Sequence, residues 1–339
     1  MAAERPRRAV IGAGTWGTTL ALLLSKSERV TLLARDEQHA AQLTRDGENQ
    51  RYLPGIPLDR DISITADPGS LESADELVVV AVPSAVLRTT VTAAADHIVG
   101  EAVLLSVAKG IENGTLLRMS QVITAVLPAH ADRVAVLSGP NLAPEIARGL
   151  PAGAVVAARD ETVSQRVVDV LGSRGFRLYR NPDLIGVELA GALKNIVAIV
   201  AGAVDGLGAG DNGKAAITTR GLAEITRLGV AMGAHPMTFS GLAGIGDILA
   251  TCSSPLSRNH RLGTELAAGR SWSEVEGSLP GVAEGAYTVR AALALAERYG
   301  VDMPIAREVE AVLYRGKDVR ASLADLLSRE SKDELSGLA

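Results

Sequence analysis

The strongest constraint on the fold is a glycine pattern near the N-terminus of this 339-residue chain. Residues 9–17 read AVIGAGTWG, so a short apolar run leads into Gly12-x-Gly14-x-x-Gly17, and a helix-forming stretch follows. The first glycine of such a unit permits a tight turn, the second lets backbone approach a pyrophosphate, and the third lets helix and strand pack closely. Free N–H groups at the helix start favour bound phosphate. The pattern predicts a dinucleotide-binding turn, with a glycine turn in an unrelated α/β protein as the alternative.

The rest of the first half alternates apolar runs with helix-length segments. The runs are almost continuously apolar, as expected for strands buried on both faces of a parallel sheet. Predicted strands are residues 9–11, 30–34, 77–82, 103–107, 134–137 and 154–158, with helices between several of them, including 18–27 and 38–45. This βαβ repetition predicts an α/β fold with a Rossmann-like doubly wound sheet.

The second half changes character near Ile185, where the strand-like runs stop. Predicted helices are residues 188–204, 214–232, 261–268, 286–298 and 305–314, joined by turns rich in Gly, Pro and Ser. We therefore expect a dinucleotide-binding domain at 1–185 and a mainly α-helical substrate and catalytic domain at 186–339. Two domains suit this length, at about 150 residues each.

Composition narrows the possible partners. A net charge of −5 and only 3% aromatic residues argue against a nucleic-acid binder. A single cysteine and five scattered histidines exclude an intrachain disulfide and argue against a zinc cluster, so we expect no metal. Arg5, Arg7 and Arg8 precede an apolar stretch as in a secretory signal, but glycine and polar interruptions follow at 12–18. No uninterrupted apolar run reaches the ~18 residues of a membrane span.

The end of the second predicted strand bears on the choice between NAD and NADP. An acidic residue there favours the ribose of NAD, whereas an arginine can receive the 2′-phosphate of NADP. This chain has Arg35 followed by Asp36. Arg35 stands closer to the strand end, so we expect NADP to be tolerated and leave both cofactors open. The alternative is a solvated pair of charged loop residues.

Polar residues follow two other predicted strands, at the edge where open α/β sheets bind ligands. Lys109 follows the run VLLSV in the sequence SVAKG, an unusual place for a merely solvating lysine. Gly139 and Asn141 follow another strand in VLSGPN. Asn141 has an alternative role as the cap of a helix that continues through Ala147.

Lys194 is the strongest single candidate. It lies in ELAGALKNIVAIVAG, a predicted helix that is otherwise almost wholly apolar. A buried charge is costly unless it is paired, so Lys194 and its neighbour Asn195 should face a polar cavity. Burial and a nearby cation such as Lys109 would lower the pKa of Lys194 towards neutrality, which suits a general base. The alternative is a lysine that extends to water.

A second polar group lies in GLAGIGDILATCSSPLSRNHR. Asp247 sits among glycines and apolar residues, and pairing with Lys194 would satisfy both charges. Ser257, Arg258 and Asn259 stand where a helix starts and make a natural phosphate clamp. The alternative is a Ser257 cap with solvated Arg258 and Asn259. We interpret Cys252 as a packing residue, because nothing near it in sequence resembles an acid–base partner.

These residues resemble those of a known family over about 8–326. The segments GAGTWGT, NQRYLPG, VAVPS, AKGIE, SGPN, ELAGALKN, ITRGLAE, GLAGIGD and SRNHRLG occur in the order seen in bacterial-type NAD(P)-dependent glycerol-3-phosphate dehydrogenases. The resemblance implies interconversion of sn-glycerol 3-phosphate and dihydroxyacetone phosphate, a phosphorylated triose. It also implies a cytoplasmic, commonly dimeric enzyme that supplies glycerol phosphate for phospholipid synthesis.

The resemblance also assigns roles by position. It implies that Lys194 is the proton acceptor and that Lys109 contacts both substrate and the nicotinamide region. Other substrate positions are Gly139, Asn141, Asp247, Ser257, Arg258 and Asn259, and other cofactor positions are Thr15, Trp16, Arg35, Ala143, Arg258, Val282 and Glu284, besides the three glycines of the turn. Two positions depart from the usual pattern: Asn141 replaces a Ser or Thr, and Thr15 replaces a common Ser.

The expected reaction is hydride transfer at C2 of the substrate. Arg258, Asn259 and nearby backbone N–H groups would hold the phosphate, and Lys194 would exchange the proton of the C2 oxygen. Asp247 would orient Lys194, and Lys109 would add positive charge near the oxyanion. One alternative is another hydroxyacid or sugar dehydrogenase of the same architecture. The other is a catalytically silent NAD(P)-sensing protein, which should lack Lys194 or Asp247.

Overall fold

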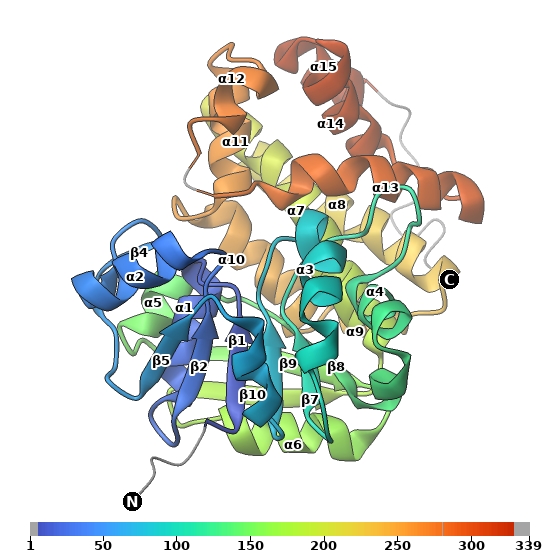
Figure 1. Cartoon of the computed structure of the whole chain (residues 1–339). Helices are drawn as coiled ribbons and strands as arrows, with labels where there is room; N and C mark the ends of the chain where they lie inside the picture. The colour runs from blue at the N-terminus through green and yellow to red at the C-terminus, as the bar shows by residue number, and fades with distance from the viewer. Residues whose placement is uncertain (1–5, 280, 329–339) are drawn as a thin grey trace, which may run out of the picture. The chain divides into compact units, whose positions relative to one another are not determined.

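A computed structural model describes residues 6–279 and 281–328 of the chain (Figure 1). The chain divides into two compact units. The first comprises Met1–Ala108 and Met119–Leu184, and the second comprises Lys109–Arg118 and Ile185–Ala339. The segment Lys109–Arg118 is continuous in sequence with the first unit but packs with the second.

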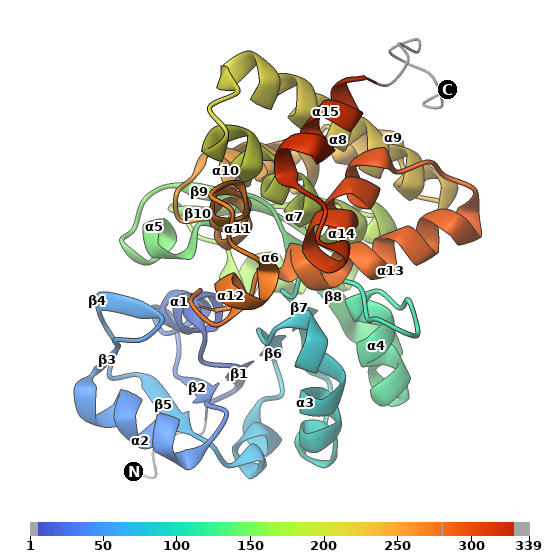
Figure 2. The same ribbon diagram turned by 90° about the horizontal axis from the view of Figure 1, so that it is seen from above.

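The first unit is built on an eight-stranded sheet with the order β10-β9-β8-β7-β6-β1-β2-β5. Six of these strands can be followed across Figure 2, from β5 through β2, β1, β6 and β7 to β8. All neighbouring pairs are parallel except β8 and β9. The strands are β1 (Arg8–Ile11), β2 (Val30–Leu33), β5 (Ile62–Thr65), β6 (Leu77–Val80), β7 (Val103–Ser106), β8 (Val134–Ser138), β9 (Ala152–Ala158) and β10 (Phe176–Asn181).

The order of strands in space is that of a doubly wound dinucleotide-binding sheet, extended by β9 and β10. Every residue of β1, β2, β6 and β7 is buried. Since neighbouring side chains on a strand point to opposite faces, both faces of this central region are covered. The predicted α/β class and the six predicted strands are therefore confirmed.

Two sheet strands and a small hairpin escaped the sequence prediction. β5 has the short sequence ISIT, and β10 reads FRLYRN with mostly polar, accessible side chains. Both lie at an edge of the sheet, where one side needs no apolar cover. The hairpin consists of β3 (Glu48–Asn49) and β4 (Leu53–Pro57).

Helices connect the strands of the first unit. The α1 helix begins at Thr15, three residues before the predicted start at residue 18, because Gly14 already serves as its N-cap. Asp36 caps α2 by accepting a hydrogen bond from the backbone N–H of His39 at 2.7 Å. The helices are α1 (Thr15–Leu24), α2 (Glu37–Asp46), α3 (Leu87–Ala94), α4 (Met119–Val126), α5 (Ala143–Ala147) and α6 (Glu161–Leu171), with 3₁₀ turns η1 (Pro68–Ser73), η2 (Ser84–Val86), η3 (Ala95–His97) and η4 (Pro128–Arg133).

Apart from the loop Lys109–Arg118, the second unit is built from helices in its described residues, as predicted. Its elements are α7 (Leu184–Gly206), α8 (Gly210–Ala231), α9 (Pro236–Phe239), the π-turn η5 (Leu242–Gly246), α10 (Asp247–Ser253), α11 (Arg258–Ala267), α12 (Trp272–Glu276), α13 (Glu284–Tyr299), α14 (Pro304–Arg315) and α15 (Val319–Leu327). Two glycines let α7 and α11 approach at backbone distance. A methyl group at Gly263 would lie 1.8 Å from the Ile199 carbonyl oxygen, and one at Gly202 would lie 1.9 Å from that of His260.

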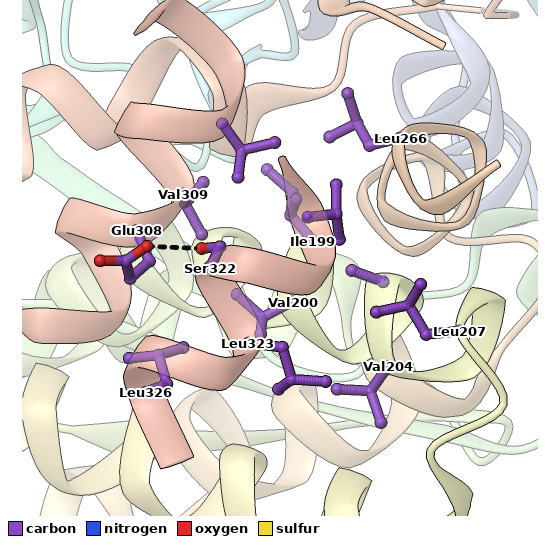
Figure 3. A pocket seen from close by; sticks show the side chains of 13 residues that line it. Ile199, Val200, Val204, Leu207, Leu266, Glu308, Val309, Ser322, Leu323 and Leu326 are labelled. Carbon is purple, nitrogen blue, oxygen red and sulfur yellow. Dashed lines mark hydrogen bonds between the residues drawn. The ribbon is translucent and has the colours of Figure 1, made fainter. Parts of the chain in front are cut away.

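The α7 helix is the central element of this unit. Its 23 residues make it the one described helix that is long and apolar enough to cross a membrane, yet 83% of its most apolar window is buried inside the fold. Such extensive burial is typical of a core helix. One face of α7 contributes Ile199, Val200 and Val204 to an apolar pocket of about 40 Å³, shared with α11, α14 and α15 (Figure 3). None of the predicted site residues lines that pocket.

Candidate functional site

The glycine turn adopts the geometry that its sequence predicts. Gly12 has a φ of 109°, and its N–H donates to the Leu33 carbonyl at 2.9 Å. A methyl group at Gly17 would lie 1.9 Å from the Gly12 carbonyl oxygen, so only glycine allows α1 to pack this closely. A methyl group at Gly14 would meet nothing within 4 Å. The open space above Gly14 at the start of α1 fits the pyrophosphate of a dinucleotide.

Three further predicted cofactor positions lie near this turn within the first unit. Thr15 and Trp16 open α1, and the indole ring of Trp16 packs edge-on against Phe176 at 6.1 Å between ring centroids. The indole Nε1 of Trp16 is buried without a hydrogen-bond partner among the described residues. Ala143 is the first residue of α5, and its carbonyl accepts a bond from Thr19 Oγ1 at 3.4 Å.

Arg35 and Asp36 follow β2, where the sequence left NAD and NADP open. The Arg35 Nε donates to Asp36 Oδ2 at 2.8 Å, and the Arg35 side chain is 65% exposed. The hydrogen bond from the His39 backbone, and then the one from Arg35, holds the pKa of Asp36 below its usual value. Because Asp36 is engaged as the α2 cap, Arg35 is the freer of the two charges.

Gly139 and Asn141 follow β8. Gly139 has a φ of 139°, and a methyl group there would lie 3.0 Å from the Ala154 Cα. The cap proposed for Asn141 is wrong: Leu142 is the N-cap of α5, and no side chain caps that helix. Both polar atoms of the Asn141 amide are buried and have no hydrogen-bond partner among the described residues. An amide left unpaired in this way is costly unless a ligand or water satisfies it.

Three predicted residues meet in the second unit. Lys194 on α7 and Asp247 at the start of α10 are 6% and 1% exposed. The Lys194 Nζ lies 2.9 Å from Asp247 Oδ1, and the Lys109 Nζ lies 2.5 Å from Asp247 Oδ2. Lys194 therefore does not extend to water, and its expected pairing with Asp247 is confirmed. One carboxylate holds two ammonium groups, which leaves the cluster with a net positive charge.

The electrostatics of this cluster suit proton transfer. Burial lowers the pKa of Lys194 to about 8; the carboxylate of Asp247 opposes this shift, and the charge of Lys109 adds to it. Burial would raise the pKa of Asp247, but Lys109 and Lys194 hold it below its ordinary value. At pH 7 roughly one Lys194 in ten is then neutral, so both protonation states are accessible. A group of this kind can act as acid or base near neutrality.

The local fold explains how Asp247 reaches this position. The segment LAGIG forms η5, a single turn of π-helix, and π-helical turns occur frequently at functional sites. A methyl group at Gly244 would lie 2.0 Å from the Phe239 carbonyl oxygen, so the turn requires glycine there. Asp247 is the first residue of α10, where the helix dipole favours a carboxylate.

Sequence reasoning missed Thr251. Its Oγ1 accepts a hydrogen bond from Lys194 Nζ and lies 3.2 Å from Asp247 Oδ1. The spacing of four residues from Asp247 on a helix was a usable signal, since it places both side chains on one face. Cys252 follows it and is buried, and burial raises the pKa of its thiol to about 12, as the packing interpretation expects.

The residues at the start of α11 form a second polar group. Ser257 caps the helix by accepting from the His260 N–H at 3.2 Å. Asn259 is buried: its Nδ2 donates to Asn195 Oδ1 at 2.9 Å, and its Oδ1 accepts from the Gly285 N–H at 3.0 Å. The alternative of a solvated Asn259 is therefore wrong, and these bonds link the start of α11 to α7 and α13.

Arg258, Val282 and Glu284 lie beside that group. Arg258 is exposed, and a methyl group at Gly281, which has a φ of 102°, would lie 2.8 Å from its Nη1. Glu284 is the first residue of α13 and interacts electrostatically with Arg258. Within residues 6–279 and 281–328, no cluster of three or more His, Cys, Asp or Glu side chains could hold a metal ion. The arrangement has the charge and the hydrogen-bonding groups that anion binding and proton exchange require.

Comparisons with known proteins agree with this chemistry. Models of the N-terminus and C-terminus of NAD-dependent glycerol-3-phosphate dehydrogenase match residues 8–164 and 183–324. Curated relatives named glycerol-3-phosphate dehydrogenase [NAD(P)+] include one from Streptomyces avermitilis, 45% identical over 97% of this chain and 98% of its own. Another from Frankia casuarinae is 47% identical over 97% of this chain and 98% of its own.

A solved structure extends the similarity to three dimensions. The glycerol-3-phosphate dehydrogenase of Coxiella burnetii superposes with a TM-score of 0.90 at 34% identity, covering 96% of this chain and 99% of the other. Nearly complete coverage in both directions leaves no large part of either chain unmatched. This chain therefore belongs to the NAD-dependent glycerol-3-phosphate dehydrogenase family.

Proposed function

We propose that this protein interconverts sn-glycerol 3-phosphate and dihydroxyacetone phosphate with NAD(H) or NADP(H). The observation that carries the proposal is the cluster of Lys109, Asp247 and Lys194, in a chain about 45% identical to relatives named for this activity. A catalytically silent NAD(P)-sensing protein would have no reason to retain one buried and one partly buried cation on one buried carboxylate, because such a cluster is costly to maintain.

The start of α11 is our proposed site for the substrate phosphate. Arg258 is an exposed guanidinium there, Asn259 is a fixed amide, and free backbone N–H groups of a ten-residue helix add a positive dipole end. Ser257 holds the first turn of the helix in place. Gly139 and Asn141 are also proposed to contact the substrate, and the unpaired amide of Asn141 offers both a donor and an acceptor.

Lys194 is our proposed acid and base for the C2 oxygen. In the reductive direction its ammonium donates a proton to that oxygen, and in the oxidative direction the neutral amine accepts the proton. The nicotinamide supplies or takes the hydride at C2 when the cofactor is bound. Asp247 and Thr251 orient the Lys194 amine, and Lys109 adds positive charge where the oxyanion develops. Proton transfer of this kind contributes roughly 10²–10⁴-fold to rate.

The test is reduction of dihydroxyacetone phosphate by NADPH with purified protein. Lys194→Met should reduce kcat by roughly 10²–10⁴-fold, whereas Lys317→Met, which removes a surface lysine, should retain wild-type kcat. Unphosphorylated dihydroxyacetone should be a poor substrate, because it lacks the group that Arg258 is proposed to bind. Near wild-type turnover of Lys194→Met, or equal use of both ketones, would contradict the proposal.

We further propose that Arg35 binds the 2′-phosphate of NADP(H). Its guanidinium is largely exposed, while Asp36 is engaged as a helix cap. Arg35→Ala should reduce kcat/KM for NADPH by about tenfold or more and leave that for NADH nearly unchanged, as expected for one lost charged contact. An unchanged NADPH-to-NADH ratio would rule this role out.

The wider role follows from the same family relationship. We propose a cytoplasmic homodimer that supplies glycerol phosphate for phospholipid synthesis. Light scattering on the purified protein tests the dimer, and fractionation of cells tests the cytoplasmic location. Disrupting the gene should make growth depend on added glycerol phosphate or glycerol; growth without either would contradict the metabolic role.

A further inference from the structure

Contacts at its start, middle and end attach the segment that carries Lys109 to the helical unit. Lys109 binds Asp247 at its start, the Asn113 Nδ2 donates to the Tyr287 carbonyl at 3.0 Å in its middle, and Arg118 binds Glu188 at its end. This explains why a segment continuous in sequence with β7 belongs to the helical unit. Only the first of these contacts includes groups proposed to act in catalysis.

The segment closes on itself as a short loop. Ile111 and Arg118 pair as an antiparallel bridge, the Glu112 N–H donates to the Leu117 carbonyl at 2.9 Å, and the Leu116 N–H donates to the Glu112 carbonyl at 2.9 Å. Leu116 has a φ of 61°, which a non-glycine residue adopts only when its surroundings require it. The bridge places Arg118 opposite Ile111, two residues beyond Lys109. The position of Arg118 therefore bears directly on that of Lys109.

The Arg118–Glu188 pair is unusually well buried. The two side chains are 8% and 7% exposed, and the Arg118 guanidinium donates directly to the Glu188 carboxylate. Burying two opposite charges gives little net stability, and the best-supported use of such pairs is to fix one arrangement among several. Glu188 lies on α7, the helix that also carries Lys194. The pair therefore fixes the loop relative to the helix of the proposed catalytic lysine.

We propose that Arg118 and Glu188 are positioning residues that hold Lys109 against Asp247, so that the Lys109–Asp247–Lys194 cluster is assembled entirely within the helical unit. The kinetic consequences of this inference rest on the proposed function, whereas its structural consequence does not. If the pair is broken, the loop loosens and Lys109 leaves Asp247. Lys194 then loses a like charge and no longer shares its carboxylate.

A shift in pH dependence distinguishes this role from a general loss of stability. The titratable groups that act on the Lys194 amine are Asp247, Lys109 and the thiol of Cys252. Only Lys109 is displaced when the loop loosens, and its departure raises the pKa of Lys194 above about 8. Arg118→Met should therefore move the alkaline limb of dihydroxyacetone phosphate reduction upwards, in the same direction as Lys109→Met. Arg118→Lys, which keeps the charge, should restore the limb at least in part.

A double-mutant cycle provides the decisive comparison. Arg118→Met should reduce kcat/KM by roughly 10–100-fold in the wild-type background. It should have almost no further effect in a Lys109→Met background, because the residue that it positions is already gone. The matched control is Arg8→Met, which removes an equally buried arginine paired with Glu76 in the first unit. Arg8→Met should leave the alkaline limb in place. Fully additive losses for Arg118→Met and Lys109→Met would overturn the inference.

Hydrogen exchange measured by mass spectrometry tests the loop without any substrate. Amides in peptides spanning 110–118 should exchange at least tenfold faster in Arg118→Met, and in Glu188→Gln if the arginine variant folds poorly, while Arg8→Met matches wild type. Wild-type exchange of this loop in both folded variants would overturn the inference. If the wild type failed to reduce dihydroxyacetone phosphate but the loop still loosened in the variants, the proposed function would fail and the positioning role would stand.

Discussion

Replacing Asp247 with Asn removes the carboxylate that the buried Lys194 and the partly buried Lys109 share. The side chain keeps its size, so the change acts mainly on charge. Lys194 and Lys109 lie 2.9 Å and 2.5 Å from the two oxygens of Asp247 in the wild type. In the variant they face a neutral amide, and each charge loses its principal counter-charge. The pKa of Lys194 must therefore fall, because its ammonium form loses more stabilisation than its amine form.

The distances give the size of this effect. A unit charge pair at 2.9 Å has an attraction of about 6 kcal/mol at an effective dielectric constant of about 20. Removing one partner of a buried pair costs about 3–5 kcal/mol after relaxation. Taking roughly 3 kcal/mol as the part that Lys194 feels, its protonation should weaken by roughly two pH units. Lys194, whose pKa is about 8 in the wild type, would then be mostly neutral at pH 7.

Steady-state reduction of dihydroxyacetone phosphate from pH 5.5 to 9.5 tests the reasoning. Reduction needs protonated Lys194, so the alkaline limb should move from near pH 8 to roughly pH 6 in Asp247→Asn. At pH 7 kcat/KM should fall roughly 10²–10³-fold, about tenfold from the lost proton and the rest from lost orientation of Lys194. Thr251→Val is the matched control, because it removes the other partner of Lys194 without changing charge.

The same substitution has a consequence for stability. In the wild type the pKa of Lys194 is about 8 in the folded state and 10.5 when unfolded, so the unfolded state binds more protons between these values. The free energy of unfolding therefore rises with pH across that window, and in Asp247→Asn the rise should begin at lower pH.

In the activity assay, an alkaline limb of Asp247→Asn that stays near pH 8, with activity within threefold of wild type, would refute the electrostatic account of this cluster.

Three further predictions concern other parts of the fold. Gly14→Ala should keep the wild-type Tm, because its methyl group meets no protein atom within 4 Å, but should reduce NADPH affinity measured by fluorescence titration, because the methyl group projects where the pyrophosphate is expected. Gly17→Ala should lower both the Tm and the NADPH affinity. Equal behaviour of the two variants would contradict this prediction. Glu224 is buried, and burial raises its pKa to about 7 from 4.5. Its contribution to the free energy of unfolding is therefore fully present below pH 4.5 and is lost as pH rises through 7, because ionisation is disfavoured in the folded state. Glu224→Gln should flatten that slope, worth about 3 kcal/mol, in urea unfolding at several pH values, and an unchanged slope would rule out Glu224 as its source. Val309→Ile adds one methylene group to the apolar pocket of Figure 3 and should raise the free energy of unfolding by up to about 1 kcal/mol, while a lower Tm would mean that the pocket cannot admit it.

Much of the fold could be predicted because its signals are local. The central strands are short runs buried on both faces, so their apolar residues are continuous in sequence. The glycine turn needs specific backbone conformations, which only its glycines allow. The apolar pattern did not predict the edge strands β5 and β10, because a strand at the edge of a sheet does not need an apolar residue at every position. The antiparallel pairing of β8 with β9 was not predicted either, since direction is set by the connection and not by composition.

The opening glycine pattern and the lone lysine in an apolar helix are properties of the sequence by itself. The glycines are recognisable because a tight turn with close helix packing requires them, and the lysine because a charge in an apolar helix is costly unless it is paired. Only the tertiary structure decided which groups pair with the buried charge of Lys194. Lys194 and Asp247 are 53 residues apart, and Lys109 and Asp247 are 138 apart, so their pairing depends on how the helices pack. The same packing joins Asn259 to Asn195 and buries Arg118 against Glu188. No periodicity in the sequence encodes these contacts, because they arise only when separate elements bury their faces together.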